Sequence, residues 1–504
     1  MPEPRTWQLT ACSAVLGLAL SAGAVTAAGP WDNGQRKAER ARAAAATPTG
    51  GAHHAAPRPP AGPQRPAPAP SAAGVLRALD TPRTALGSDL AAVLVPLLAD
   101  PGLGPLRTAS VVDATTGKQL YGEGATTPMT PASTIKIATS VAALSALGAD
   151  HRIPTTVVAS PDARTVTLVG GGDPTLDRAR LKSLAGSTAR ALKARGVTGG
   201  VRIAYDTRLY QGPARHPIGP NDNIAPVSAL MLHAGRLDTS DSGPAPRSAD
   251  PARDTAEAFA ELLAKAGTKV QGTPTPGRAP KAANAPEAGN GSKAGNGSEA
   301  GNDPKAADDR KAADGSKAVQ LARTESAPLS DLVERTLTHS DNDLAEALAR
   351  QTALARKQPA SFTGAGKAVR AELASLGLPT AGTRFADGSG LSRDNRLSAA
   401  LLTGLLTRAA DPTRPALRPV LTGLPVGGFS GTLEGRFDTG TATTGAGLVR
   451  AKTGTLTGVN TLAGTVVTAD GRLLAFAFLA GRTPSPYTAQ PALDRLSAAL
   501  APQG

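Results

Sequence analysis

Two long tracts that cannot form a hydrophobic core divide the 504-residue chain. Residues 29–82 are rich in Ala, Pro and Arg, a composition typical of extended, solvated linkers. Residues 274–322 contain near-repeats of Gly, Asn, Ser, Ala and Lys (AGNGSKAGNGSEAGNDPKAADD), which predicts a disordered loop. Stable tertiary structure is therefore expected only from about residue 83 to that loop, and again after it.

Residues 1–28 are typical of an export signal. Arg5 precedes the apolar run LTACSAVLGLALSAGAVTAAG, and the small residues near Val25 and Ala27 offer a cleavage site. The run of about 20 residues is also long enough for an uncleaved membrane anchor. Both alternatives predict that the bulk of the protein lies outside the cytoplasm, in the cell envelope. The single cysteine, Cys12, excludes a disulfide framework.

The formal charge of +14 is a weak indication of a nucleic-acid partner, because aromatic residues make up only 3% and none accompanies a basic motif. We therefore expect no nucleic-acid partner. The six histidines form no HExxH pair, which argues against a metallopeptidase. We expect neither a metal nor a cofactor.

The segments outside the two tracts show helix and strand patterns. SDLAAVLVPLLAD predicts a helix capped by Ser88, and RTASVVDATTGKQLYGE predicts two strands around a turn. After the loop, APLSDLVERTLTHSDNDLAEALARQTAL predicts two helices, the second with a capping box at Asp343 and Glu346. VRAKTGTLTGVNTLAGTVVTADGRLLAFAFLAG predicts two further strands, with a turn at Asp470-Gly471 between them. We expect one domain, formed by residues 83–158 and 324–502, interrupted by an inserted region at 159–323.

The stretch MTPASTIKIATS places two polar residues at the start of an apolar helix. If Thr130 caps the helix and Pro131 is its first residue, Ser133 lies in the first turn, where its N–H has no partner within the helix. Its hydroxyl could attack a carbonyl while its own amide stabilises the oxyanion. Lys136 lies on the same face, and a desolvated amine there could act as the base. Taken alone, the pair could equally be a chance serine and a lysine that reaches water.

Two further short motifs follow in the sequence. In SDN, Ser340 offers a hydroxyl that can relay a proton, and Asn342 an amide that can hold a peptide group. In KTGT, Lys452 supplies a cation and Gly454 permits close approach of another backbone. Each motif alone could be an ordinary turn or an exposed strand start.

Taken together and in this order, the three motifs resemble those of the penicillin-interacting serine enzymes. The long interval between the first and second motifs resembles the class C penicillin-binding proteins, the D-alanyl-D-alanine carboxypeptidase/endopeptidase family. Further stretches are similar to that family over roughly residues 84–502: LVGGGDPTL, APVSALML, SDNDLAEAL, DGSGLSRDNRLS and RAKTGTLTGVNTLAG. The resemblance implies an α/β fold of the β-lactamase/transpeptidase type, an antiparallel sheet flanked by helices, with a large insertion between the first and second motifs.

The resemblance also implies a reaction, in which Ser133 attacks the penultimate D-Ala carbonyl with Lys136 as base. Ser340, close to Lys452, would pass a proton to the departing D-Ala, and Asn342 would hold the acyl-side amide.

The substrate would lie along the strand that carries Lys452, Thr453 and Gly454. The hydroxyls of Thr453 and Thr455 would bind the carboxylate of the substrate, and the amides of Ser133 and Thr455 would form the oxyanion hole.

The implied partners are peptidoglycan stem peptides ending in D-Ala-D-Ala and the β-lactams that mimic them. A β-lactamase is one alternative, although no ExxLN sequence lies between the second and third motifs. A non-catalytic wall-associated protein with the same fold is another, although all three motifs are intact. The sequence leaves carboxypeptidase and endopeptidase action unresolved.

Overall fold

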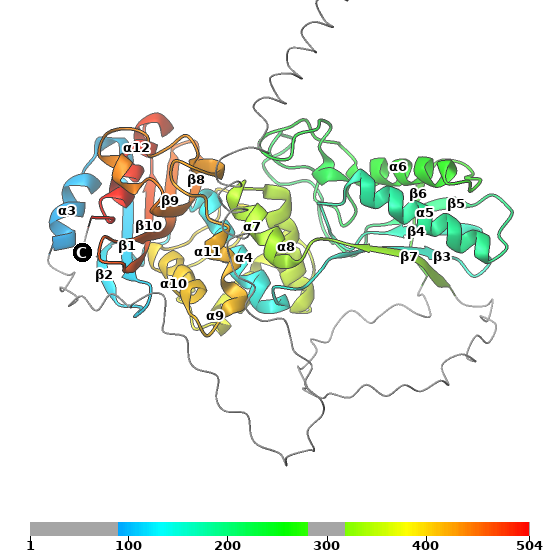
Figure 1. The fold of residues 1–504 in the computed structure, drawn as a ribbon, viewed down its shortest axis with the longest axis horizontal. Coiled ribbons are helices and arrows are strands. Elements are labelled where there is room, and N and C mark those ends of the chain that lie inside the picture. The colour runs from blue at the N-terminus through cyan, green and yellow to red at the C-terminus, as the bar shows by residue number, and fades with distance from the viewer. Residues whose placement is uncertain (1–88, 281–317, 503–504) are drawn as a thin grey trace, which may run out of the picture. The chain divides into compact units, whose positions relative to one another are not determined.

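A computed structural model describes residues 89–280 and 318–502 of the chain (Figure 1). All of them belong to one unit. The expected signal at 1–28 and the expected linker at 29–82 lie outside the described residues. Within 89–280 and 318–502, no helix combines the length and the apolar character that a membrane span needs.

The first sheet is antiparallel throughout and is assembled from both ends of the described chain. Its strand order is β2-β1-β10-β9-β8, and Leu106 of β1 pairs with Gly481 of β10. The two strands expected on either side of the Thr116-Gly117 turn are β1 and β2. The bounds are β1 Leu106–Asp113, β2 Gln119–Glu123, β8 Val449–Leu456, β9 Val459–Val467 and β10 Leu473–Gly481.

Helices cover both faces of this sheet. Successive side chains along a strand point to opposite faces, and here both faces are apolar, so each must be buried against helices in an apolar cluster of its own. On β10, Ala475 and Ala477 face one cluster, whereas Phe476 and Phe478 face the other. The fold class expected from the resemblance is thereby confirmed. One cluster includes α4 Ile135–Leu147, α7 Leu329–Thr338, α8 Asn342–Ala355, α9 Phe362–Ser375, α10 Ala399–Ala410 and α11 Pro419–Thr422, and the other α3 Asp89–Leu98 and α12 Pro486–Ala498.

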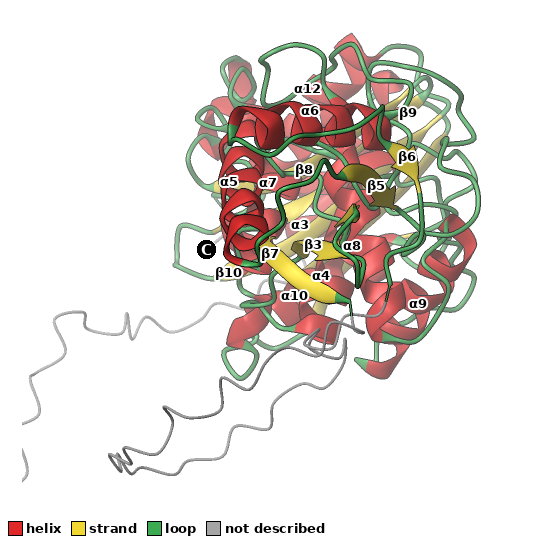
Figure 2. Cartoon of the chain, turned by 90° about the vertical axis from the view of Figure 1, so that its right-hand side faces the viewer, coloured by secondary structure: helices red, strands yellow, loops and turns green. Residues whose placement is uncertain are grey.

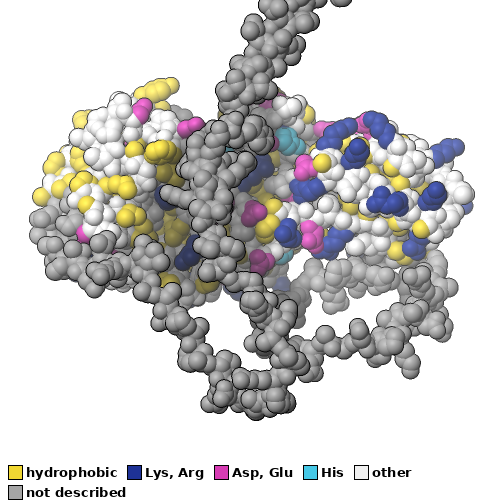
Figure 3. All heavy atoms as spheres, viewed as in Figure 1, with side chains coloured by type: hydrophobic (Ala, Val, Ile, Leu, Met, Phe, Trp, Pro, Cys, Tyr) yellow, Lys and Arg dark blue, Asp and Glu magenta, His cyan; other side chains and the backbone are white. Residues whose placement is uncertain are grey.

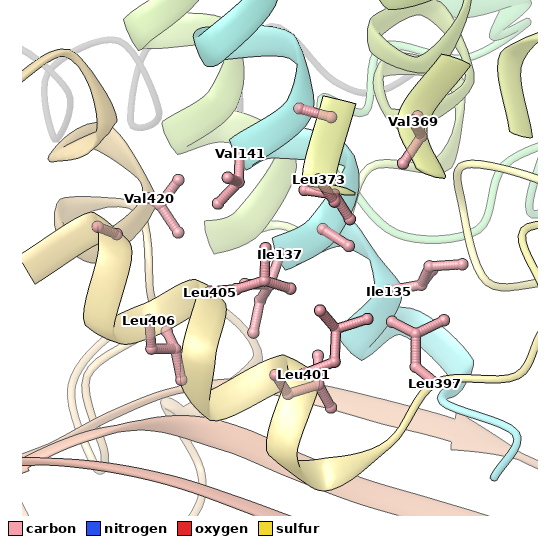
Figure 4. Packing of buried hydrophobic residues seen from close by; sticks show 14 of the residues in the cluster. Ile135, Ile137, Val141, Val369, Leu373, Leu397, Leu401, Leu405, Leu406 and Val420 are labelled. Atoms are coloured by element: carbon pink, nitrogen blue, oxygen red, sulfur yellow. The ribbon is translucent and has the colours of Figure 1, made fainter. Parts of the chain in front are cut away.

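The central element of the first cluster is α4. Ile137 and Val141 lie among side chains from neighbouring helices, including Leu405 of α10 (Figure 4). Every residue from Ile135 to Leu144 is buried. A helix that is enclosed on all sides must be apolar around its whole circumference, which explains the composition of this segment. Because the helix is enclosed, the Lys136 side chain cannot extend its amine to bulk water.

The second sheet is mixed and has the order β6-β5-β4-β3-β7, with β4, β5 and β6 mutually parallel. α5 Arg178–Ala194 and α6 Pro251–Lys265 pack on it around Phe259, which is fully buried (Figure 2). The strands are β3 Pro154–Ala159, β4 Thr165–Val169, β5 Arg202–Asp206, β6 Thr275–Pro276 and β7 Val319–Glu325.

The limits expected for the inserted region pass through two of these strands. The limit after residue 158 falls inside β3 and the one after 323 inside β7, yet these strands pair with each other in the second sheet. We therefore propose residues 154–325 as the inserted region. The loop expected at 274–322 is wrong at its ends, because β6 and β7 form there. Its middle, 281–317, lies outside the described residues.

Two helix starts differ from the expected ones. Pro131 is followed by a 3-10 turn, and α4 begins only at Ile135, while the Thr130 hydroxyl donates to the Arg393 carbonyl instead of capping. α8 is capped by Asp341, which accepts from the Leu344 N–H, not by Asp343. The 3-10 turns are η2 Pro101–Leu103, η3 Ala132–Thr134, η4 His233–Gly235, η5 Pro415–Leu417, η6 Gly431–Leu433 and η7 Gly440–Gly445.

Basic side chains lie among acidic ones over the part of the surface formed by α5 and α6 (Figure 3). Glu261 pairs with both Arg178 and Lys265, and Arg253 pairs with Glu257. These ion pairs are exposed and contribute little to stability, but their carboxylates partly neutralise the positive charge on this face.

Candidate active site

Ser133 and Lys136 meet at the junction of η3 and α4. The Lys136 amine donates a hydrogen bond of 2.9 Å to the Ser133 hydroxyl oxygen. Ser133 precedes the first α-helical residue, Ile135, so its N–H stands outside the α-helical hydrogen-bond ladder. The 3-10 turn differs from the expected start of the helix, but it still puts the two side chains within hydrogen-bond reach.

The Lys136 amine has two further acceptors. It donates to Oδ1 of Asn342 at 2.7 Å and to the backbone carbonyl of Ser389 at 2.5 Å. Asn342 is the first residue of α8, so the second expected motif lies against the first. Three acceptors satisfy all three protons of a charged ammonium group.

Burial lowers the pKa of Lys136 to about 8, although the negative charge of Asp387, and after it that of Asp341, acts in the opposite direction. The side chain has no exposed surface, so the charged form loses most of its hydration. An appreciable fraction of the amine is therefore neutral near physiological pH. A neutral amine in hydrogen-bond contact with a serine hydroxyl can accept its proton.

Lys452 is the other buried amine at the site. Burial lowers its pKa well below the ordinary value, and the positive charge of Lys136 lowers it further. Its amine donates to the Thr453 carbonyl at 2.9 Å. Within the described residues, no hydrogen bond joins it to Ser340. The proximity of Ser340 to Lys452 that the resemblance implies stays a prediction.

Ser340 lies between α7 and α8 in the left-handed region, at φ 57°, and Ala132 beside Ser133 has φ 47°. Such conformations are uncommon for residues other than glycine and persist only where the surroundings impose them. Ala132 directly precedes Ser133, and Ser340 lies two residues before Asn342, whose side chain accepts a hydrogen bond from Lys136. The Ser340 hydroxyl makes no hydrogen bond within the described part of the chain.

Gly454 allows β8 to approach the segment before Ser133. A Cβ at this position would lie 2.2 Å from Oγ1 of Thr461 and 2.7 Å from the Pro131 carbonyl. Thr461, on β9, itself donates to that carbonyl at 2.8 Å. The close backbone approach expected of this glycine is therefore present.

The two threonines of the third motif lie on the accessible side of β8. Thr455 is exposed and Thr453 partly so. The Thr453 hydroxyl bonds to that of Thr432 at 2.9 Å, and the Thr455 hydroxyl accepts a long bond of 3.5 Å from Gln490. Both hydroxyls are therefore available to a ligand on this side.

A loop between α9 and α10 supplies a contact that sequence reasoning missed. The carboxylate of Glu346, on α8, accepts from the N–H groups of Gly388 and Ser389 at 2.9 Å each. This fixes the loop so that the Ser389 carbonyl faces Lys136. Two glycines around a serine in DGSG are the only signal in the sequence for such a loop.

Within the described residues, His216, Glu346 and Asp387 form the one group of potential metal ligands that lie close together. Their oxygens already have protein partners. Oε2 of Glu346 accepts from Arg350 at 2.8 Å, and Oδ1 of Asp387 accepts from the Gly390 N–H at 2.8 Å. This cluster is therefore explained as a hydrogen-bonded support.

Comparisons with known proteins identify the family to which the chain is similar. The family described as D-Ala-D-Ala carboxypeptidase 3 (S13) matches residues 90–246 and 305–500. Carboxypeptidase DacB of Mycolicibacterium smegmatis is 37% identical over 457 residues, which cover 87% of this chain and 89% of that protein. A D-alanyl-D-alanine carboxypeptidase of Actinomadura sp. is 31% identical over 455 residues, covering 79% of this chain and 82% of that protein.

A crystal structure of penicillin binding protein 4 from Haemophilus influenzae has a similar fold. Its TM-score is 0.60 at 21% identity, and the match covers 82% of this chain and 97% of that one. The chain belongs to the D-Ala-D-Ala carboxypeptidase 3 (S13) family, so the resemblance to class C penicillin-binding proteins is confirmed. The expected class of enzyme, a serine-type D-alanyl-D-alanine carboxypeptidase, is confirmed with it. This membership agrees with a location outside the cytoplasm.

Proposed function

We propose that the protein cleaves peptidoglycan stem peptides after the penultimate D-Ala, with Ser133 as nucleophile and Lys136 as base. One observation carries the proposal: the Lys136 amine lies 2.9 Å from the Ser133 hydroxyl oxygen in a site that lowers its pKa to about 8. Serine is a weak nucleophile at its ordinary pKa and needs a neighbouring base. Within the described residues, no other side chain makes a hydrogen bond with its hydroxyl.

In the first step, the Ser133 oxygen forms a bond to the D-Ala carbonyl carbon while its proton passes to the neutral Lys136 amine. The N–H groups of Ser133 and Thr455 stabilise the negative carbonyl oxygen that results. Breaking the C–N bond releases the terminal D-Ala, and the proton that Lys136 accepted passes to its nitrogen by way of Ser340 and Lys452. Water then hydrolyses the acyl-enzyme and regenerates the Ser133 hydroxyl.

The position of β8 supports the proposed binding mode. β8 is the edge strand of the first sheet, and residues 425–427 pair only with its beginning, up to Ala451. The part from Lys452 onward leaves an edge to which an extended peptide can add as a further strand. The peptide carboxylate would then lie near the hydroxyls of Thr453 and Thr455, and Asn342 would hold the acyl-side amide.

We further propose that β-lactams acylate Ser133. A second Haemophilus influenzae penicillin binding protein 4 structure contains a β-lactam. The cyclic amide would react with Ser133 as the peptide does. Endopeptidase action on cross-linked peptides needs the same chemistry and is a second candidate function. Rapid turnover of a chromogenic β-lactam would instead favour a β-lactamase.

We also propose that the protein acts in the cell envelope. The apolar run within residues 1–28 supports export, either as a cleaved signal or as a retained anchor.

Fluorescent penicillin labelling of the full chain tests the nucleophile. We expect covalent labelling of the unaltered protein and none of Ser133→Ala. Ser140→Ala is a matched control, because Ser140 is a buried serine on the same helix whose hydroxyl has no hydrogen-bond partner among the described residues. Labelling that persists in Ser133→Ala would refute the proposal. Release of free D-Ala from a pentapeptide, compared with cleavage of cross-linked dimers, separates the two peptidase activities.

A further inference from the structure

A neutral Lys136 amine can accept a proton from Ser133 only if its lone pair points at that hydroxyl. A neutral amine has two N–H bonds and one lone pair. If both N–H bonds are held by other acceptors, the lone pair must take the remaining direction. Asn342 and Ser389 are those acceptors, at 2.7 and 2.5 Å. The groups that hold these two oxygens in place therefore determine the direction of the Lys136 lone pair.

The inserted region fixes the first acceptor. The side-chain nitrogen of Asn342 donates to the backbone carbonyl of Asn223 at 3.0 Å. An amide that donates from its nitrogen in this direction must present its oxygen to Lys136. Asn223 belongs to the loop between β5 and η4, in the inserted region.

The same loop reaches the second acceptor through His216. Nε2 of His216 lies 2.9 Å from Oδ2 of Asp387, and both side chains are almost fully buried. Nδ1 of His216 accepts from the Ile218 N–H at 3.2 Å, so the proton of a neutral imidazole is on Nε2 and is donated to Asp387.

Asp387 in turn holds the loop that carries Ser389. Its carboxylate accepts from the N–H groups of Gly390 at 2.8 Å and Ser392 at 2.6 Å. It also accepts from the side chain of Asn395 at 2.7 Å. A carboxylate held by His216 therefore fixes the backbone that directly follows the Ser389 carbonyl, including the Gly390 N–H of the same peptide group.

We propose that the inserted region is part of the catalytic apparatus and that His216 is a positioning residue for Lys136. Through His216 and the Asn223 carbonyl, one loop of that region holds both acceptors that aim the Lys136 lone pair at Ser133. The inference rests on the proposed roles of Ser133 and Lys136. It assigns His216 no contact with substrate and no transfer of a proton.

A purely structural role is the competing explanation, because His216 also packs edge-on against the ring of Phe362 at 5.3 Å. Two amide substitutions separate the explanations. In His216→Gln, the side-chain nitrogen can reach the position of Nε2 and still donate to Asp387. In His216→Asn, the amide corresponds to Nδ1 and is too short to reach it. Both remove the aromatic ring and both bury an amide.

The measurement is the acylation of the full chain by fluorescent penicillin, resolved into the affinity before acylation and the rate constant of acylation. We expect His216→Asn to lower the rate constant on the order of 10-fold or more, with little change in affinity, since misplacing a catalytic group acts on the chemical step. His216→Gln should recover most of the rate. Arg215→Gln, which alters the exposed neighbouring side chain, should label as the unaltered protein does.

Each outcome decides between the explanations. Equal rate constants for His216→Asn and the unaltered protein would overturn the inference. So would equal losses in the Asn and Gln variants, including a shared failure to fold, because that result follows from the lost ring. If the unaltered protein is not labelled at all, the proposed function fails first.

Discussion

The first sheet has helices on both faces and carries the three motifs around it, whereas the second sheet packs α5 and α6 and supplies none of the proposed reacting groups. The two regions differ in whether they bury an ionisable group that can react. Helix α4 is enclosed on all sides, and this lowers the pKa of the Lys136 amine. The inserted region contributes a backbone carbonyl and one histidine, which hold groups that the first region provides. Chemistry and support therefore come from different parts of the chain.

The largest expected effect comes from removing the base in the first region. Lys136→Ala should lower the rate of acylation by on the order of 10³-fold or more, because Ser133 then has no group to accept its proton. Labelling by fluorescent penicillin over several hours measures the loss. Labelling of Lys136→Ala at the ordinary rate would mean that another group is the base.

Substitution of Gly454 should separate β8 from the nucleophile. In Gly454→Ala, the new methyl group would lie 2.2 Å from Oγ1 of Thr461, so the strand must move away from Pro131. We expect acylation to fall by on the order of 10²-fold. Gly435→Ala is the matched control, since a Cβ there meets no neighbouring atom. Comparable rates for the two variants would show that the close approach is unnecessary.

Substitution of Asp387 should move the pH dependence of acylation. Because Lys136 must be neutral to accept a proton, acylation should rise with pH through the pKa of Lys136, about 8. The negative charge of Asp387 raises that pKa. In Asp387→Asn the charge is lost, so the acidic limb of the profile should shift to lower pH, together with a lower maximum rate from the disturbed loop.

The control for this shift is Asp394→Asn, which removes an exposed carboxylate from the same loop. Its profile should coincide with that of the unaltered protein. A shift of the Asp387→Asn profile to higher pH would contradict the assignment of the limb to Lys136.

The smallest expected effect on chemistry comes from the core of the inserted region. Phe259 is fully buried in the cluster of the second sheet, and Phe259→Leu should lower the free energy of unfolding by roughly 1–2 kcal/mol. Acylation should stay within about twofold of the ordinary rate, because the contacts of His216 and Asn223 are left in place. Denaturation and labelling of one sample measure both quantities. A large loss of labelling would show that the core of the inserted region also affects the chemical step.

The sequence predicted the parts of the site that depend on local spacing. Ser133 and Lys136 are three residues apart, so one turn of helical backbone brings them together even though η3 replaces the expected first turn. The strand pattern from Val449 to Gly481 predicted two strands, whereas the structure has three, β8, β9 and β10, because the chain also reverses direction between Leu456 and Val459. Asp343 was misassigned as a cap because the spacing of a capping box does not show which acid lies at the helix end. Its carboxylate is instead paired with Arg247 of the inserted region.

The parts of the site that sequence reasoning missed depend on long-range contacts. His216 and Asp387 are separated by 171 positions, and no periodicity links them. Ser389 and Asn223 accept their hydrogen bonds through backbone carbonyls. Every residue has such a carbonyl, so the residue type gives no sign of this role. The limits expected for the inserted region differ from the ones we propose for a similar reason, since β3 and β7 are recognisable as partners only once their ladder is formed.

The pairing of β1 with β10 constrains how this chain folds during synthesis. β1 is among the first described elements and β10 among the last, yet they are adjacent in the sheet. Closing so long a loop is slow, and β1 has only the short β2 as a partner until the last strands exist. A partly synthesised chain therefore lacks the platform on which Ser133 is aligned. The hydrolase becomes competent only after the chain has been synthesised at least as far as β10.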